Sequence, residues 1–170
     1  SSLAQDNEVR SLILASACPK YFSAGMDLEH IFSQPAQSQQ DAFHELLDLH
    51  KELALWPKPT VAAISGHAIL GGWILAMACD FRYLVSHARI ALSEVKLGIS
   101  PTTLLINTLA RMGARQSLVK EMILTGKTLM SHEALEGGFV DKLLPRESLW
   151  PESLRQAELL AQLPVKAYGS

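Results

Sequence analysis

The stretch SGHAILGGWILAMACD, residues 65–80, indicates how this chain folds. It follows the apolar run Thr60–Ile64, whose small and β-branched residues predict a strand. Glycine permits a tight backbone turn after such a strand, and the helix-forming residues that follow predict a helix beginning near Gly71 or Gly72. A strand that turns directly into a helix is a building unit of α/β proteins.

The rest of the chain repeats this alternation of strands and helices. Apolar runs predict further strands at Val9–Ala15, Phe81–Val85, Arg89–Leu92 and Phe139–Leu143. Helical spacing and the glycines and prolines that end it predict a short helix opened by Ser131 and longer helices at 39–55, 102–112, 115–124 and 152–163. Residues 18–28 are expected to form a loop. The alternation predicts an α/β fold with a largely parallel sheet.

The composition is that of one globular domain. The chain has 170 residues, of which 48% are hydrophobic and 19% charged, enough for one core. Its net charge of −2 gives no electrostatic reason to expect a nucleic acid or an anionic membrane as a partner. Cys18 and Cys79 form no CxxC pair, so neither a disulfide scaffold nor a zinc module is indicated. The most apolar span, Ala68–Cys79, is too short to cross a bilayer.

Several common catalytic motifs are absent from the sequence. Gly126-Lys127-Thr128 is not a phosphate-binding loop, because that motif needs a glycine at position 121, which is Glu. His132-Glu133 lacks a second histidine four residues after the first, so no zinc-protease helix is formed. No G-x-S-x-G elbow occurs, and residues 66–72 do not fit the G-x-G-x-x-G pattern. We therefore expect no metal ion, no separate cofactor and no serine nucleophile.

Two loops have the small residues that allow a ligand to contact the backbone. Residues 22–28, FSAGMDL, and residues 66–72, GHAILGG, both follow apolar strands and both carry small residues at the turn. Small residues let a ligand approach the backbone, and the first N–H groups of a helix have no partner within it. Two such N–H groups directed at one point would stabilise an oxyanion. Considered locally, however, both segments are also compatible with ordinary glycine-containing turns.

Several ordered blocks together resemble the crotonase superfamily. They are the two loops, with the second extended to residue 80, followed by ALSEVKLGI at 91–99, LTGK at 124–127 and EALEGGFVD at 133–141. The resemblance covers roughly residues 8–146. It implies a spiral of ββα units with a core at 1–146 and the start of a C-terminal helical region at 147–170. The family's first strands and its last helices are expected to be missing or shortened here.

The resemblance also implies a substrate class, an assembly and residue roles. The substrates would be acyl-CoA thioesters, with coenzyme A as part of the substrate, and the assembly a homotrimer or a dimer of trimers. The backbone N–H groups of Met26 and Gly71 would form the oxyanion hole. The loop beside coenzyme A corresponds to Ala24, Gly25, Asp27 and Leu28.

Other residues are given more modest roles. Trp73 and Ile74 are candidates for the acyl pocket, although apolar residues on such a helix are more often plain core. Phe43 and Leu47 lie on a helix that forms a pocket wall in the family, and they stay unassigned. His67 is expected to be structural, Asp80 to cap or form a turn, and Asp27 to accept hydrogen bonds from nearby backbone N–H groups.

The acid/base positions favour one reaction among those of the superfamily. The hydratases that this chain resembles carry two glutamates, and the corresponding positions here hold Ile74 and Glu94. A lone carboxylate is poorly equipped to orient water for hydration, but one base suffices to move a double bond. The pattern is similar to that of Δ3,Δ2-enoyl-CoA isomerases, and an apolar neighbour raises the pKa of a carboxyl group. The expected function is therefore a shift of a 3-enoyl-CoA double bond to the trans-2 position, with Glu94 as the single acid/base.

Two alternatives stay open at this point. One is another crotonase reaction, such as hydration, thioester hydrolysis or decarboxylation. The other is an acyl-CoA-binding subunit without turnover. The expected setting is fatty acid metabolism, as in β-oxidation, in a bacterial cytoplasm, with mitochondria and peroxisomes as further possibilities.

Overall fold

The structure, a computed structural model, describes residues 2–164 and contains two four-stranded sheets. The first sheet has the order β1-β3-β5-β8, and all its strands are parallel. Its strands are β1 (Leu12–Ala15), β3 (Thr60–Ile64), β5 (Phe81–Val85) and β8 (Lys142–Leu144). The second has the order β2-β4-β6-β7, and only its β6–β7 pair is antiparallel. Its strands are β2 (Tyr21–Ser23), β4 (His67–Ile69), β6 (Arg89–Ala91) and β7 (Thr128–Met130).

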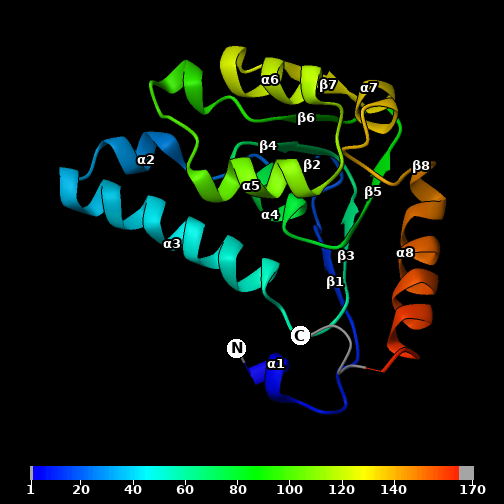
Figure 1. The fold of residues 1–170 in the computed structure, drawn as a ribbon. Coiled ribbons are helices and arrows are strands. Elements are labelled where there is room, and N and C mark those ends of the chain that lie inside the picture. The colour runs from blue at the N-terminus through cyan, green and yellow to red at the C-terminus, as the bar shows by residue number, and fades with distance from the viewer. Residues whose placement is uncertain (1, 165–170) are drawn as a thin grey trace.

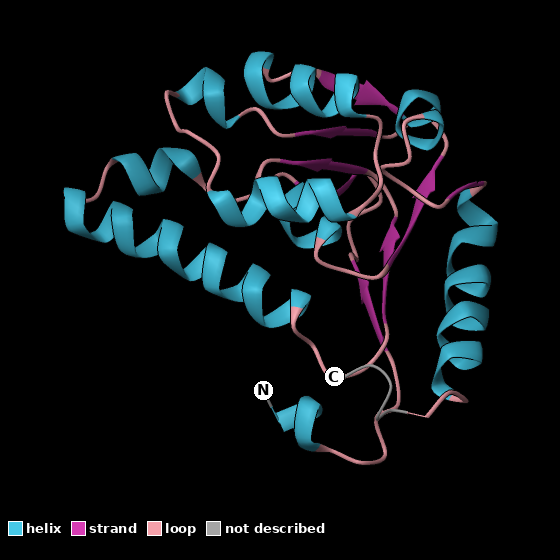
Figure 2. Cartoon of the chain, in the orientation of Figure 1, coloured by secondary structure: helices cyan, strands magenta, loops and turns pink. Residues whose placement is uncertain are grey.

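Helices connect and cover the two sheets (Figures 1 and 2). They are α1 (Ser2–Gln5), α2 (Leu28–Phe32), α3 (Ala36–Ala54), α4 (Gly71–Met77), the 3₁₀-helix η1 (Glu94–Leu97), α5 (Thr103–Arg111), α6 (Gln116–Thr125), α7 (Ser131–Glu136) and α8 (Arg146–Ala161). Three times in succession, a strand of the first sheet leads to a strand of the second and then to helix. These units are β1-β2-α3, β3-β4-α4 and β5-β6-α5. The expected spiral of ββα units is confirmed.

The core lies around the central strands of the first sheet. All five residues of β3 are buried, because the strand has a neighbour on each side and α8 packs against it. Trp73, Tyr83 and Phe139 are the largest of the fully buried side chains. Helix α8 contacts β1, β3 and β5 and buries Leu149, Ala157 and Leu160, and Figure 1 shows it running along this sheet.

Several predicted elements need correction. The regions expected to be a loop and a tight turn contain the three-residue strands β2 and β4, and the strand β7 and the helix α2 were also missed. Strands this short carry too little periodicity to be recognised, and they form here because neighbouring strands pair with them. Strand β8 begins three residues after Phe139, which is buried against Trp73 instead.

The last helix also differs from expectation. It begins at Arg146 rather than at residue 152 and continues through Pro151, whose missing N–H leaves one carbonyl of the first turns without its helical partner. The division of the chain at residue 146 stays a prediction, and its last six residues, 165–170, lie outside the described part. Within residues 2–164, no helix is both long and apolar enough to cross a membrane.

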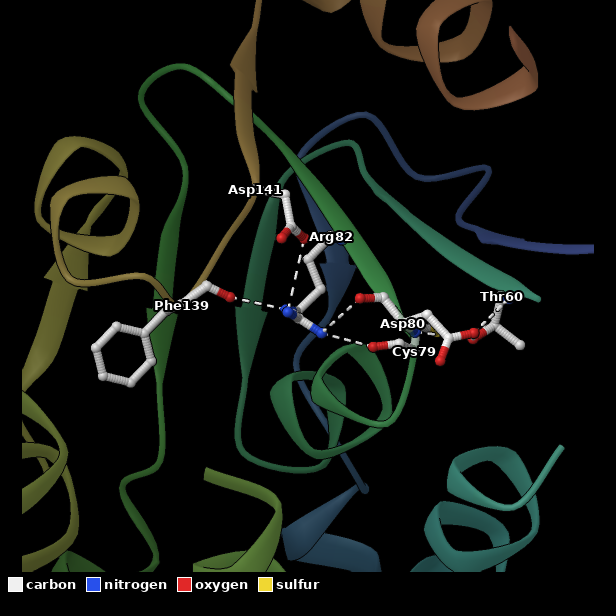
Figure 3. A network of polar contacts seen from close by, with 6 residues as sticks. All are labelled: Thr60, Cys79, Asp80, Arg82, Phe139 and Asp141. Atoms are coloured by element: carbon white, nitrogen blue, oxygen red, sulfur yellow. Dashed lines mark hydrogen bonds and ion pairs between the residues drawn. The ribbon is translucent and has the colours of Figure 1, made fainter. Parts of the chain in front are cut away.

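A buried arginine on β5 joins that strand to the end of α4 and to the segment before β8 (Figure 3). Arg82, only 6% exposed, donates from Nε to the Phe139 carbonyl over 2.8 Å and from a terminal nitrogen to the Cys79 carbonyl. Its other terminal nitrogen lies 3.6 Å from the Asp141 carboxylate, which also accepts the Arg82 backbone N–H over 2.7 Å. The bonds therefore hold β5, the end of α4 and the segment before β8 in one arrangement.

Asp80 provides a second polar link at the same place. One of its carboxylate oxygens accepts both the N–H and the hydroxyl of Thr60, over 2.8 and 2.9 Å. The Asp80 N–H in turn donates to the Thr60 hydroxyl over 2.9 Å. Thr60 is 2% exposed, so without Asp80 its N–H would have no water to bond with. Asp80 is thus structural, but it acts by a contact with the start of β3 rather than as the helix cap or turn former that was expected.

We expect Asp80→Ala to lower the free energy of unfolding by about 1–3 kcal/mol, because it leaves a buried backbone donor unpaired. Asp80→Asn is the matched control, since its side-chain amide oxygen can still accept the Thr60 N–H. Urea unfolding of both variants measures the difference. An equal loss in the two variants would contradict the assigned role of the N–H bond.

Candidate active site

The loops singled out in the sequence line one apolar cavity of about 170 Å³. One wall is α3, with Phe43, His44, Leu46 and Leu47. The opposite side is made by Met26, Leu28 and the turn into α4, and the remainder comes from η1 and the segment leading into α5. Four segments of the chain, within residues 26–28, 43–47, 70–74 and 94–105, thus line one space.

The two loops touch through their glycines. A Cβ added to Gly25, whose φ is +89°, would lie 2.8 Å from the Gly71 nitrogen. A Cβ added to Gly71 would lie 3.2 Å from the Gly25 Cα and 3.1 Å from a Leu46 methyl carbon. Gly25 therefore requires glycine both for its conformation and for lack of space, whereas a Cβ at Gly71 would be tight and would push its neighbours by a few tenths of an ångström. The contact brings the backbone N–H of Gly71 next to the loop that contains Met26.

Both candidate N–H groups are free to bind a ligand oxygen. Within residues 2–164, neither the Met26 nor the Gly71 N–H donates a hydrogen bond. Met26 and Gly71 also line the cavity. Gly71 is the first residue of α4, and free N–H groups at a helix start favour negative charge, so its N–H is suited to bind an oxygen that carries negative charge.

The residue before Gly71 has an unusual backbone. Leu70 adopts a φ of +51°, a conformation that costs free energy for a residue with a side chain. Its N–H donates to the Ala91 carbonyl over 2.9 Å, and its carbonyl accepts the Ile74 N–H over 3.0 Å. These bonds hold the turn in a shape that places Gly71 at the first position of α4.

Glu94 is half-buried at the start of η1 and lines the same cavity. Its Oε1 is buried and has no hydrogen-bond partner among the described residues. Burial raises the pKa of this carboxyl above its ordinary value of 4.5, and a backbone hydrogen bond offsets part of that effect. An unpartnered carboxylate in an apolar cavity has the properties of a general base.

The structure brings together most of the predicted site residues. Met26, Leu28, Gly71, Ile74 and Glu94 all line the cavity. Their catalytic and binding roles stay predictions.

The other predicted site residues do not line the cavity. Asp27 instead accepts the His30 N–H over 3.0 Å and caps α2, which is the kind of backbone bond expected of it. Ala24 and Gly25 belong to the adjoining loop. Trp73 is fully buried with its ring centroid 6.4 Å from that of Phe139, so its prediction as a pocket residue is corrected. Consecutive helical residues point about 100° apart, which is why Ile74 faces the cavity and Trp73 the core.

Some cavity residues were not predicted as site residues. Phe43 and Leu47 share a face of α3 at helical spacing, and that spacing is the signal that could have assigned them. His44, also on α3, has no such signal. The segment after Glu94 contributes Leu97, Ile99, Ser100, Pro101, Thr102 and Leu105.

His67 has the structural role expected of it. Its Nδ1 accepts the Arg89 N–H over 3.1 Å, which helps to join β4 to β6. Within the described residues, no three His, Cys, Asp or Glu side chains lie close enough together to hold a metal ion.

The fold and cavity define a class of protein: a ββα spiral whose strand-to-helix loops line an apolar cavity that also holds the half-buried Glu94. A family model described as enoyl-CoA hydratase/isomerase matches residues 1–169. The chain therefore belongs to the enoyl-CoA hydratase/isomerase family, within the crotonase superfamily, as its sequence motifs indicated.

Relatives in this family have more than one activity. The chain is 33% identical to the mitochondrial methylglutaconyl-CoA hydratase of Mus musculus, over 96% of this chain and 54% of that protein. It is 28% identical to the mitochondrial Delta(3,5)-Delta(2,4)-dienoyl-CoA isomerase of Homo sapiens, over 97% of this chain and 54% of that protein. The crystal structure of an enoyl-CoA hydratase from Bacillus anthracis superposes with a TM-score of 0.91 at 30% identity, covering 99% of this chain and 65% of that one. The chain spans about half the length of these curated relatives.

The raised pKa of Glu94 predicts how stability depends on pH. A carboxyl whose pKa is higher in the folded than in the unfolded chain stabilises the fold fully below the unfolded value, near 4.5, and this contribution is lost as pH rises through the folded pKa. Glu94→Gln cannot ionise. We expect the variant to be more stable than the wild type at about pH 8, with the excess disappearing at about pH 4. Urea unfolding at both pH values measures this, and a difference independent of pH would contradict burial as the cause.

Proposed function

We propose that this chain carries an enoyl-CoA isomerase site that converts 3-enoyl-CoA into trans-2-enoyl-CoA, with Glu94 as the single acid/base. The observation that supports it best is the pairing of Glu94 with Ile74 in one cavity. Glu94 supplies a carboxylate, and Ile74 supplies a hydrocarbon wall where a second carboxylate would be needed to orient water. His44 is the other titratable group among the described residues of the wall, and it lies exposed on α3.

The proposed reaction needs one base and two N–H donors. The Glu94 carboxylate removes a proton from C2 of the 3-enoyl thioester, and the electrons move onto the thioester oxygen to give a dienolate. The N–H groups of Met26 and Gly71 bind that oxygen as it gains charge. The protonated Glu94 then returns the proton to C4, the 2,3 double bond forms and the thioester carbonyl is restored. Atoms and charge balance, and Glu94 ends as it began.

The surroundings of Glu94 support this role. Burial raises its pKa, so the carboxylate is a stronger base than one in water and the acid a suitable proton donor. Between the two transfers the proton must stay on Glu94, and apolar walls such as Ile74, Leu97 and Ile99 limit exchange with solvent.

Hydration is the second candidate, because relatives of this chain are named hydratases. The hydroxyls of Ser100 and Thr102 line the cavity and could help orient a water molecule. The alternative of an acyl-CoA-binding subunit without turnover predicts no reaction with either substrate. Trimeric assembly and a bacterial cytoplasmic location stay predictions from the resemblance.

The test uses two substrates with the purified protein. With trans-3-hexenoyl-CoA, we expect the absorbance of the conjugated enoyl thioester to rise. With crotonyl-CoA, we expect no fast loss of that absorbance. Fast loss from crotonyl-CoA would mean hydration and would contradict the role assigned to Ile74, and no change with either substrate would contradict isomerisation.

Substitution of Glu94 tests its role in turnover. We expect Glu94→Gln to lower kcat for the isomerisation by about 10²–10⁴-fold, because the amide cannot accept the C2 proton. Affinity for the acyl-CoA should change little, because Gln has nearly the same size and shape as the Glu that it replaces. Glu158→Gln, an exposed carboxylate on α8, is the matched control and should keep wild-type kcat. Turnover by Glu94→Gln within threefold of wild type would remove Glu94 from the mechanism.

A further inference from the structure

A buried histidine connects α3, α4 and α5, three of the helices that line the cavity. His50, on α3, has no exposed surface. Its Nδ1 lies 2.7 Å from the Ile74 carbonyl oxygen on α4, and its Nε2 lies 3.1 Å from the Thr108 hydroxyl on α5. The sequence analysis assigned no role to this residue.

The bond to Ile74 replaces one that α4 lacks. In a continuing α-helix the N–H of residue 78 would donate to the Ile74 carbonyl. Here the Ala78 N–H donates instead to the Leu75 carbonyl, over 3.2 Å, because α4 tightens at its end. The His50 ring therefore supplies the donor for a carbonyl that would otherwise be buried without one.

Hydrogen-bond accounting assigns the protons on the ring. A carbonyl only accepts, so Nδ1 must carry a proton that points at Ile74. Burial lowers the pKa of His50, so the ring is neutral and its Nε2 accepts the hydroxyl proton of Thr108. That hydroxyl also lies 3.0 Å from the Leu104 carbonyl, its alternative acceptor. In this tautomer, donation to Ile74 is independent of Thr108.

The same face of α3 contacts α4 one turn earlier. Leu46, four residues before His50, packs against Gly71, three residues before Ile74. The two contacts lie along neighbouring helices, which Figure 1 shows side by side with α5. Together they set how far α4 reaches towards the loop of Gly25, and hence where the Gly71 N–H lies.

We propose that His50 is a positioning residue for the candidate oxyanion hole, acting through its hydrogen bond to the Ile74 carbonyl. This rests on the proposed function of the cavity. Helix α4 has only seven residues, so a shift at Ile74 is transmitted to Gly71 within one turn. A displacement of about 1 Å at a reacting group can cost about 10²-fold in rate.

Two substitutions separate the two ring nitrogens. The side-chain nitrogen of Asn can lie near the position of Nδ1, so His50→Asn can still donate to Ile74. The amide of Gln reaches nearer the position of Nε2, so His50→Gln keeps Thr108 as its partner and loses Ile74. For isomerisation, we expect His50→Gln to lower kcat by about 10–100-fold with KM within about threefold, and His50→Asn to keep kcat within about fivefold of wild type.

A second readout does not depend on isomerisation. Bound acetoacetyl-CoA ionises to an enolate that absorbs in the near ultraviolet, and donors at its oxygen favour that form. We expect the pH at which half of the bound ligand is ionised to rise by about one unit in His50→Gln and to stay unchanged in His50→Asn. Urea unfolding reports the stability of each variant, and rates are expressed per folded molecule.

Each outcome decides between the proposals. Equal kcat and equal enolate titration in the Asn and Gln variants would show that His50 has only a structural role and would overturn the positioning proposal. A wild type that ionises acetoacetyl-CoA but does not isomerise 3-hexenoyl-CoA would overturn the proposed function alone. A wild type that does neither would overturn both. If His50→Gln does not fold, Thr108→Val replaces it in the test, because it removes the partner of Nε2 and leaves the bond to Ile74. Both Thr108→Val and His50→Asn should then keep kcat within about fivefold of wild type, and a tenfold loss of kcat in one of them would overturn the proposal.

Discussion

The close contact between Gly25 and Gly71 is the constraint on which the candidate site depends. Two backbone segments from different ββα units approach so closely that Gly25 has no room for a Cβ and Gly71 has little. The contact brings the turn into α4 beside the loop that contains Met26. The proposed shared binding of one thioester oxygen by the Met26 and Gly71 N–H groups depends on this contact.

The spiral architecture makes that contact possible. Because β1 pairs with β3 and β2 with β4, the loops that follow β2 and β4 leave the second sheet side by side. Each ββα unit therefore places its strand-to-helix connection next to that of the preceding unit. The polar contacts of Arg82 and Asp80 join the starts of β3 and β5 to the segment that follows α4. They therefore fix the end of α4 relative to the first sheet.

The proposed isomerisation would use two electrostatic features of the cavity. The Met26 and Gly71 N–H groups offer partial positive charge, and burial raises the pKa of the Glu94 carboxyl. Both features are stronger in apolar surroundings, which Leu28, Leu46, Ile74 and Leu105 contribute. His50 adds a polar contact behind the cavity, where it joins α3, α4 and α5 without contacting the ligand space.

The sequence by itself was sufficient for the fold class and the family, and it singled out Glu94, Met26 and Gly71, which line one cavity. The strands Thr60–Ile64 and Phe81–Val85 were predicted with the correct first and last residues, because each is a largely apolar run in the sequence. Three-residue strands such as His67–Ile69 were missed because their stability comes from the strands that pair with them. The tertiary structure alone decided that Trp73 faces the core and Ile74 the cavity, since this depends on how α4 is rotated against its neighbours. It also decided the partners of His50, which lie 24 and 58 residues away along the chain and meet it only when the helices pack.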